Sequence, residues 1–527
     1  AISDTGVVTV AGTTTLDNSG GTNAAILLNS ESTYTGNVTF TTDTGSDVTI
    51  TDNSDFAIQS GLNVNNLSIT STGSVTDLGD IDIDGTLTVS AADQTIDLSG
   101  TGNDLTGAVN LTGAAVTLVD TTATSIAGIT ATGALSVTSG GAITQTGAID
   151  ADLASSFTTS TADQAITLSN TANALTGAVS LTTSGTAGHV TIDNGTTALG
   201  VQGTVSGDLA LTSGEAITDS AALSVTGTTT MTTDVADKTI TLDTLASTGN
   251  VILTTSGTAG HVTIDNGTTA LGVQGTVSGD LVLTSGDMIT DSDVLTVTGT
   301  TTVTTDMADK AINLGSLAST GAVSLTTSGT AGNVVIDNGT TALDLGASTI
   351  SGTLSATSGA EAGIVDSGNI AVSGDVTLTT DANNGVINLG TLQQSGGDLI
   401  LTTNGTGDAT VVNNAAIDFG VSNVGGELSA TASAGTITQN GGALTVAGTS
   451  SFTAGANAIT LSNASNDFTG AVSLSNSGTN DVSLTDVNAL DLGTVSVGQN
   501  LSLTAVGAIS DTGCLLYTSP SPRDLST

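Results

Sequence analysis

The stretch LTTSGTAGHVTIDNGTTALGVQGTVSGDL at residues 181–209 occurs again, unchanged, at residues 253–281. A shorter copy, LTTSGTAGNVVIDNGTTAL, begins at residue 325, so the three copies start at equally spaced positions. Over the full segments 181–252 and 253–324 the two copies differ at only 14 positions. A fixed period of this length is the signature of a repeat architecture, in which one supersecondary unit is copied along the chain.

Weaker copies of the same repeat fill the rest of the sequence. A Gly-x-(Val/Leu) step recurs with nearly the same spacing, at Gly36, Gly107, Gly177, Gly249, Gly321, Gly397 and Gly470. A second marker recurs in the same way, at Ile2, Val75, Ile143, Ile217, Ile289, Ile364, Ile437 and Ile509. Residues 1–513 therefore form one continuous region of about seven 72-residue repeats and the start of an eighth.

Within a repeat the hydrophobic period is two. Leu209 and Leu211 alternate with Asp208, Ala210 and Thr212, and similar short runs follow throughout. Such alternation predicts half-buried strands. The runs are separated by Asp-Asn-Gly, Ser-Gly and Thr-Gly turn signals, and no segment has the pattern of a helix of three turns.

A single repeat has too few apolar side chains to bury them alone, so stacking of coil on coil is favoured. The sequence predicts an all-β fold, a parallel β-helix or β-solenoid. At roughly 20–24 residues per coil, each repeat makes three or four coils. Tyr34, Leu105, Leu175 and Phe468 share one position before the Thr-Gly step, and we expect them in the core.

Composition excludes several classes of partner. Lys and Arg number 3 against 48 Asp and Glu, which gives a net charge of −45. We therefore expect no nucleic-acid partner and no electrostatic binding to anionic membranes. No apolar run approaches the ~18 residues of a membrane helix, so this segment is not expected to insert into a membrane.

The segment 514–527 differs from the rest of the chain. It holds the single Cys (Cys514), both Pro and the single Arg (Arg523). Residues 514–524 resemble a translated sequencing adapter, so we interpret 514–527 as a non-native tail and exclude it from fold reasoning. We expect the natural protein to continue beyond Gly513 and to begin before Ala1.

Segments such as SGDLALTSGEAITDSAALSVTGTTTMTT (206–233) resemble the repetitive stalks of filamentous-haemagglutinin-type and autotransporter adhesins. The resemblance covers 1–513 and concerns repeat style, without specifying a ligand. It implies a right-handed parallel β-helix that is secreted or lies on the outer-membrane surface of a Gram-negative bacterium. It also implies an outer-membrane translocator as an export partner and cell adhesion as the function.

The side chains best suited to catalysis or metal binding recur with the repeat. His189 and His261 are one repeat position, which is Asn333 in the third copy. A polar turn residue fits that exchange better than a catalytic or metal-binding histidine. Lys238 and Lys310 are also equivalent and follow an aspartate, so we expect solvated local ion pairs with Asp237 and Asp309.

Two short motifs are weak candidates for chemistry. Asp80-Ile-Asp-Ile-Asp-Gly85 resembles the start of a calcium loop, but Ala91 occupies the position that needs a carboxylate. Alternation explains the run better, with Ile81 and Ile83 inward and the three aspartates outward, where only weak, non-specific calcium binding is expected. Asp366-Ser-Gly368 resembles a protease signature, but no histidine lies in that repeat.

We therefore assign no catalytic, cofactor-binding or metal-binding residue and predict no enzymatic activity. The leading hypothesis is a non-enzymatic structural stalk of a surface-exposed or secreted bacterial adhesin. One alternative is a spacer for an enzymatic or binding domain outside this segment. Another is an ice-binding β-solenoid, against which we note that Thr pairs such as Thr228–Thr230 do not recur on every coil and that acidic residues interrupt them.

Overall fold

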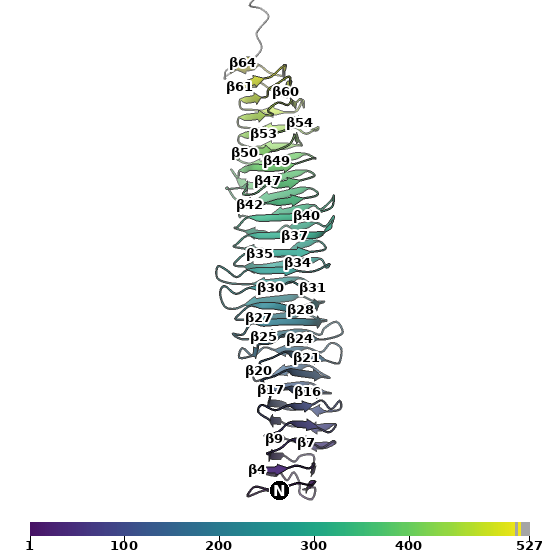
Figure 1. Cartoon of the computed structure of the whole chain (residues 1–527). Helices are drawn as coiled ribbons and strands as arrows, with labels where there is room; N and C mark the ends of the chain where they lie inside the picture. Colours follow the sequence, from purple (N-terminus) through teal and green to yellow (C-terminus); the bar gives the residue numbers. More distant parts are fainter. Residues whose placement is uncertain (512–514, 518–527) are drawn as a thin grey trace, which may run out of the picture. The chain divides into compact units, whose positions relative to one another are not determined.

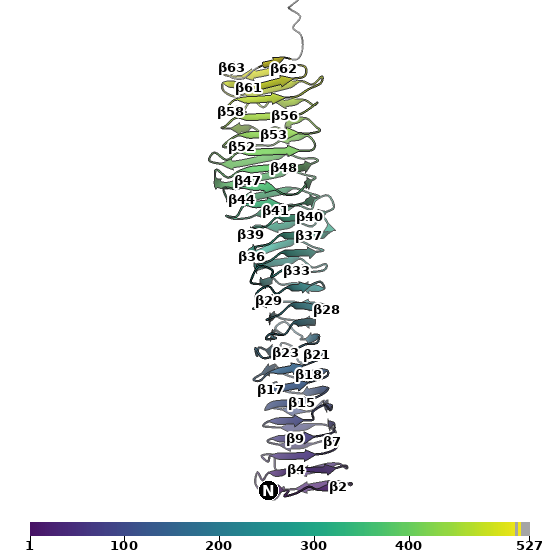
Figure 2. The same cartoon turned by 60° about the vertical axis from the view of Figure 1, so that its left-hand side comes forward.

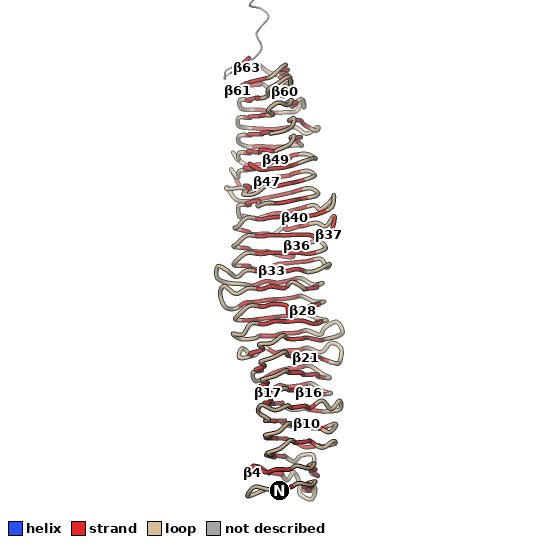
Figure 3. The backbone as a smooth tube through the Cα atoms, viewed as in Figure 1, coloured by secondary structure: helices blue, strands red, loops and turns tan. Residues whose placement is uncertain are grey.

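In the computed structural model, residues 1–511 and 515–517 are described. Every regular element among them is a β-strand, which confirms the all-β prediction (Figure 3). No helix in this part of the chain is long and apolar enough to cross a membrane. The chain divides into two compact units, Ala1–Asp265 and Asn266–Thr527, each of which is described by itself.

The strands of the first unit pair in parallel with strands about one coil away in the chain. In the register between β6 (Val48–Asp52), β9 (Leu67–Ser71) and β12 (Leu87–Ser90), Val48 lies beside Leu67, and Leu67 beside Leu87. Between Val48 and Leu67, and again between Leu67 and Leu87, the chain makes one full turn and comes back beside itself. Each such turn is one coil of a β-solenoid (Figures 1 and 2). The predicted solenoid is confirmed.

In each repeat, one set of strands lies on one side of the coils and a second set lies on the opposite side. We call the first set the straight strands. In the repeat that begins at Val190, the straight strands are β25 (Val190–Asp193), β27 (Leu209–Ser213), β29 (Thr229–Thr233) and β32 (Val251–Thr254). The opposite strands are β26 (Leu199–Val205), β28 (Ile217–Val225), β30 (Ile240–Leu242) and β31 (Leu245–Ser247). Strands β30 and β31 both pair with β28, so they form one bent segment of a coil. The repeat therefore contains seven half-coils, which is three and a half coils.

The preceding repeat has the same order. Its straight strands are β16 (Val116–Asp120), β18 (Leu135–Ser139), β21 (Ser155–Thr159) and β24 (Val179–Thr182). Opposite them lie β17 (Thr124–Ala131), β19 (Ile143–Gln145), β20 (Ile149–Ala151), β22 (Ile166–Leu168) and β23 (Ala174–Leu175).

An odd number of half-coils makes equivalent strands change sides from one repeat to the next. In the first unit, β6 and β25 belong to one sheet, whereas the equivalent β16 belongs to the other. The second unit follows the same rule. Its straight strands β41 (Val334–Asp337), β44 (Leu354–Ser358), β47 (Val376–Asn383) and β49 (Leu399–Asn404) share one sheet. The next set, β50 (Ala409–Asn413), β53 (Leu428–Ala432), β56 (Ser450–Thr453) and β59 (Val472–Ser475), lies in the other.

The core consists of ladders of aliphatic side chains that point inward from successive coils. Along one ladder, Ile50, Ile69 and Val89 are neighbours in register and at most 1% exposed. The residues expected in the core before the Thr-Gly step are all buried, at 3% exposure or less. Phe468 also packs edge-to-face on Phe452 at 5.9 Å, so these aromatic rings pack in the interior.

The outer face of the straight strands carries hydroxyl columns. Thr49, Ser68 and Thr88 form one column, and Thr51, Thr70 and Ser90 form the next. In the following repeat, one column consists of Ser136, Ser156 and Ser180, and the next consists of Thr138, Thr158 and Thr182. When serine is counted with threonine, hydroxyl pairs recur on successive strands of these two stacks. In the repeat that begins at Val190 they do not, because Asp193, Ala210 and Ile252 occupy outward positions of their strands, in line with the expectation from the sequence.

Most of the segment 514–527, interpreted above as a non-native tail, lies outside the described residues. Its described part is the backbone of β64 (Leu515–Tyr517), which pairs in parallel with Val495–Val497 of β61 (Leu490–Val497).

Candidate functional site

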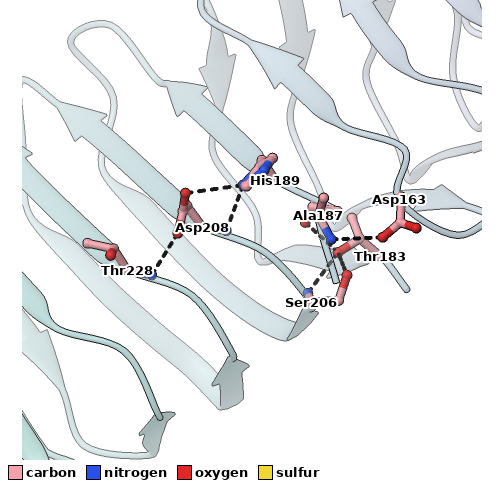
Figure 4. Close-up of polar contacts among 8 residues, drawn as sticks. Asp163, Thr183, Ala187, His189, Ser206, Asp208 and Thr228 are labelled. Atoms are coloured by element: carbon pink, nitrogen blue, oxygen red, sulfur yellow. Dashed lines mark hydrogen bonds and ion pairs between the residues drawn. The ribbon is translucent and has the colours of Figure 1, made fainter. Parts of the chain in front are cut away.

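His189 connects one coil to the next through a turn. Its Nδ1 accepts a hydrogen bond from the backbone N–H of Asp208 at 2.9 Å and lies 3.2 Å from Asp208 Oδ2 (Figure 4). Asp208 Oδ1 in turn accepts the backbone N–H of Thr228 at 2.8 Å. The His189 and Asp208 side chains are 50% and 58% exposed. The histidine is thus one member of a polar column that runs along the turns of successive coils.

The third copy of this position makes the same kind of contact without a titratable ring. Asn333 Oδ1 accepts the backbone N–H of Thr353 at 2.9 Å. An imidazole nitrogen and an amide oxygen can both accept a hydrogen bond from a backbone N–H group. The contact therefore needs an acceptor at this position and does not need a proton donor or a metal ligand.

A second set of aspartates holds the loop of the following coil. Asp163 has a positive φ of 62°, and its Oδ1 accepts the N–H groups of Thr186 and Ala187 at 2.6 and 2.8 Å. Figure 4 shows the contact with Ala187. These two hydrogen bonds, that of Thr186 first, lower the pKa of the Asp163 carboxyl. Asp237 and Asp309 have the same conformation and make the same pair of contacts.

The two lysines form ion pairs with partners other than those expected. Lys238 Nζ lies 2.8 Å from both carboxylate oxygens of Glu215, and Lys310 Nζ lies 2.9 Å from Asp287 Oδ1. Glu215 and Asp287 belong to the preceding coil, whereas Asp237 and Asp309 use their carboxylates on backbone N–H groups. The expectation of pairing between sequence neighbours was wrong because stacking of coils brings a carboxylate of the preceding coil against each ammonium group.

The acidic run at 80–84 behaves as alternation predicts. Ile81 and Ile83 are buried, and Asp82 points into a shallow groove that it shares with Asp80 and Asp104. Asp82 lies directly opposite Asp104 in register. Burial, and then the charges of Asp84 and Asp104, raise the pKa of Asp82.

Within the described residues, no group of three or more His, Cys, Asp or Glu side chains has the arrangement of a metal site. In the Asp-Ser-Gly motif at 366–368, Asp366 accepts the backbone N–H groups of Gly390 and Thr391 at 2.9 and 2.7 Å. That carboxylate therefore also holds the backbone of an adjacent coil.

Sequence reasoning missed one buried polar position in each repeat. It treated Asp193-Asn194-Gly195 as a turn signal only. In the structure, the Asn194 side chain is fully buried, and its Oδ1 accepts the N–H of Leu175 at 2.8 Å. The available signal was the regular return of Asp or Asn at the end of the same straight strand.

The fold and these contacts define a repetitive β-solenoid protein whose polar side chains bind the backbone of adjacent coils. Eight consecutive segments match the model of a family described as "Repeats of unknown function (DUF5649)". The matched residues are 1–41, 45–112, 113–182, 187–258, 259–326, 331–402, 406–475 and 479–519. Since these segments cover most of the chain, the protein belongs to that family. No curated protein and no solved structure matches the chain significantly.

Proposed function

We propose that this chain is a non-enzymatic structural stalk of a surface-exposed or secreted bacterial adhesin. The observation that carries the proposal is the even distribution of polar contacts along the repeats. Asp163, Asp237 and Asp309 each hold the next loop in the same way, and Asp208 and Asn333 each hold the next turn. A fibre needs such uniform coil-to-coil cohesion, whereas an active site needs one place that differs from its copies.

Charge and surface chemistry support the same proposal. The net charge of −45 disfavours side-by-side aggregation of exposed strands and keeps separate molecules apart in solution. The hydroxyl columns on the straight strands offer hydrogen-bonding groups without charge. We propose that adhesive contacts use these flanks or a tip beyond this segment, and that export uses an outer-membrane translocator of a Gram-negative bacterium.

Surface display of the chain tests the proposal directly. The chain is displayed on a non-adherent bacterium, and attachment to host cells and to neighbouring bacteria is counted against the same strain without it. Increased attachment is expected. Two variants test whether a hydroxyl column makes the contact. The double variant Thr138→Lys/Thr158→Lys changes such a column and should reduce attachment. The control Thr191→Lys changes an outward position of another repeat and should not.

Two results would contradict the proposal. Small-angle scattering of the purified chain should give a rod-like particle, so a compact particle would exclude a stalk. Cleavage of polysaccharide or protein by the purified chain would exclude the non-enzymatic assignment. Attachment that depends wholly on a domain outside this segment would support the spacer alternative.

The ice-binding alternative is favoured by one observation, the recurrence of hydroxyl pairs on successive strands of two stacks, β6 to β12 and β18 to β24. Thr49 and Thr51 lie beside Ser68 and Thr70 in register, with strands spaced by about 4.8 Å. Thermal hysteresis of the purified chain tests this function. A freezing-point depression that is lost in Thr51→Lys would promote ice binding over the stalk, and no depression would remove it.

A further inference from the structure

One buried position at the end of a straight strand recurs in every repeat and is occupied by either Asn or Asp. Its side chain is at most 2% exposed in each copy. The copies are Asp52, Asp120, Asn194, Asn266, Asn338, Asn413 and Asp486.

Three asparagine copies, Asn194, Asn338 and Asn413, each bind both backbone groups of a residue on the preceding coil. Asn338 Oδ1 accepts the N–H of Ser319 at 2.7 Å, while its Nδ2 donates to the Ser319 carbonyl at 2.9 Å. Asn413 Oδ1 likewise accepts the N–H of Gln394 at 2.9 Å, and its Nδ2 donates to the Gln394 carbonyl at 3.1 Å. The carboxamide thus closes a two-way contact in which one atom accepts and the other donates.

An ionised carboxylate at this position can only accept, so the aspartate copies cannot make the second contact. Asp120 is supplied with donors in another way. Its Oδ1 accepts the N–H of Leu105 at 3.2 Å and both the N–H and the hydroxyl of Thr122, and its Oδ2 accepts the Thr124 hydroxyl at 2.9 Å. Both oxygens of this carboxylate therefore have donors.

Within the part of the chain that the structure describes, Asp486 has donors for one of its two oxygens only. Its Oδ1 accepts the N–H of Phe468 at 3.2 Å, but its Oδ2 is buried and has no hydrogen-bond partner among the described residues. By analogy with the asparagine copies, Oδ2 corresponds to the donor atom of the two-way contact. A buried oxygen without a donor is costly when it carries charge and acceptable when it carries a proton.

We propose that Asp486 is a proton-operated latch: when it is protonated at Oδ2, it acts as the asparagine copies do and donates to the carbonyl of Phe468. The coil that contains Phe468 is then held at two points instead of one. Acidification thereby tightens this coil, although the protein has no histidine near it. Asp52, which accepts the N–H of Tyr34 at 3.0 Å, is a second and weaker latch, because the Ser54 hydroxyl reaches both of its oxygens.

The surroundings of Asp486 favour the protonated form. Burial raises the pKa of Asp486, and the charge of Asp467 adds to the rise, against hydrogen bonds from the N–H groups of Phe468 and Asn488. The strands that pair with β60 (Val482–Asp486) are β57 (Ile459–Leu461) and β62 (Leu501–Ala505), and neither contains a charged residue. Asp467 is thus the charged group to consider.

The sign of the pH effect follows from this direction. A carboxyl whose pKa is raised on folding binds its proton more tightly in the folded state, so its contribution to stability is complete below the ordinary aspartate value of about 3.9. That contribution is lost as the pH rises through the raised pKa.

The test compares the full chain with D486N by amide hydrogen exchange of the segment around Phe468, at pH 4 and pH 7.5. Exchange is corrected for intrinsic rates, and each variant is compared with wild type at the same pH, which removes the general effect of net charge. At pH 7.5, D486N should be at least about threefold more protected, and the difference should vanish at pH 4.

D120N is the matched control at the same repeat position, and it should not gain protection at either pH around Leu105. D52N should also increase the protection of the segment around Tyr34 at pH 7.5, by a smaller factor than D486N increases that of the segment around Phe468. The proposal fails if D486N is less protected than wild type at pH 7.5, or if the difference between them is the same at both pH values. It also fails if D120N shows the same pH-dependent gain.

Discussion

Gly185 lies directly over the carboxylate of Asp163 on the preceding coil. A Cβ atom at Gly185 would lie 2.3 Å from Asp163 Oδ1, and the residue has a positive φ of 90°. The same relationship joins Gly257 to Asp237 and Gly329 to Asp309. The loop therefore needs glycine for two reasons, close approach and backbone conformation.

Gly185→Ala should destabilise this loop by about 2 kcal/mol or more, because it introduces both a steric overlap and an unfavourable φ. Gly200→Ala is the control, since a Cβ there meets its nearest atom at 3.6 Å and the φ is not positive. Local unfolding measured by amide exchange around Thr186 should accelerate in the first variant only. Equal behaviour of the two variants would show that the overlap is relieved without cost.

The Asp163 contact should also be sensitive to acid. Hydrogen bonds from Thr186 and Ala187 lower the pKa of Asp163, so the folded state prefers the ionised form. The resulting stability is present above the ordinary aspartate pKa of about 3.9 and is lost as the pH falls through the lowered value. Exchange of the Thr186 amide should therefore accelerate, after intrinsic correction, when the pH is lowered from 5 to 2.

Asp163→Asn separates charge from hydrogen bonding at this turn. The amide oxygen can still accept the two N–H groups, so this variant should keep the loop ordered but remove the pH dependence. A pH response that persists in Asp163→Asn would assign the effect to another carboxylate.

A buried hydroxyl position gives a second matched pair. Ser155 and Thr229 occupy equivalent positions at the starts of β21 and β29 and are at most 2% exposed. Thr229 Oγ1 lies 3.1 Å from the Ser247 hydroxyl, whereas Ser155 Oγ has no partner among the described residues. Ser155→Ala should raise the free energy of local unfolding by roughly 1 kcal/mol, since it removes an unsatisfied polar atom.

Thr229→Val, in contrast, should lower the free energy of unfolding by about 1 kcal/mol because it leaves the Ser247 hydroxyl with one contact fewer. Urea titration followed by amide exchange in the two segments measures both effects. A loss of stability in Ser155→Ala would indicate that its hydroxyl has a buried water as partner.

The sequence predicts the elements of this fold better than it predicts their contacts. Alternation of apolar residues and the regular repeat period identify strands, turns and stacking, because both depend on patterns that can be read along the chain. The number of half-coils in a repeat is different, since a 72-residue period divides about equally well into three or four coils. Only the register, for example Val190 opposite Leu209, shows that the number is three and a half.

The same limit explains the polar contacts. The partner of Lys238 is Glu215 on the coil before, and that of Leu175 is Asn194 on the coil after. The two residues of each pair lie about one coil apart in the sequence, and no local sequence motif shows that they meet. Repeat-to-repeat comparison carries the missing signal: a position that alternates only between Asp and Asn is a hydrogen-bonding position, even when its neighbours read as a turn.

The pair of carboxylates at Asp82 and Asp104 should respond to salt. The two residues are opposite each other on parallel strands β11 (Ile81–Ile83) and β14 (Asp104–Leu105), and like charges in such positions repel. Asp82→Asn should therefore slow local unfolding of this sheet at low ionic strength, and the gain should shrink in 1 M salt, where the screening length is about 3 Å. Amide exchange of the sheet measures the effect, and Asp97→Asn, which removes an aspartate from the adjacent sheet, controls for the change in net charge.

Calcium distinguishes this repulsion from a specific site at the same carboxylates. Added calcium should stabilise wild type slightly and Asp82→Asn less, with no saturation at micromolar concentration, because no three-carboxylate metal arrangement exists among the described residues. A saturable micromolar response in wild type that Asp82→Asn abolishes would instead establish a specific calcium site in this groove.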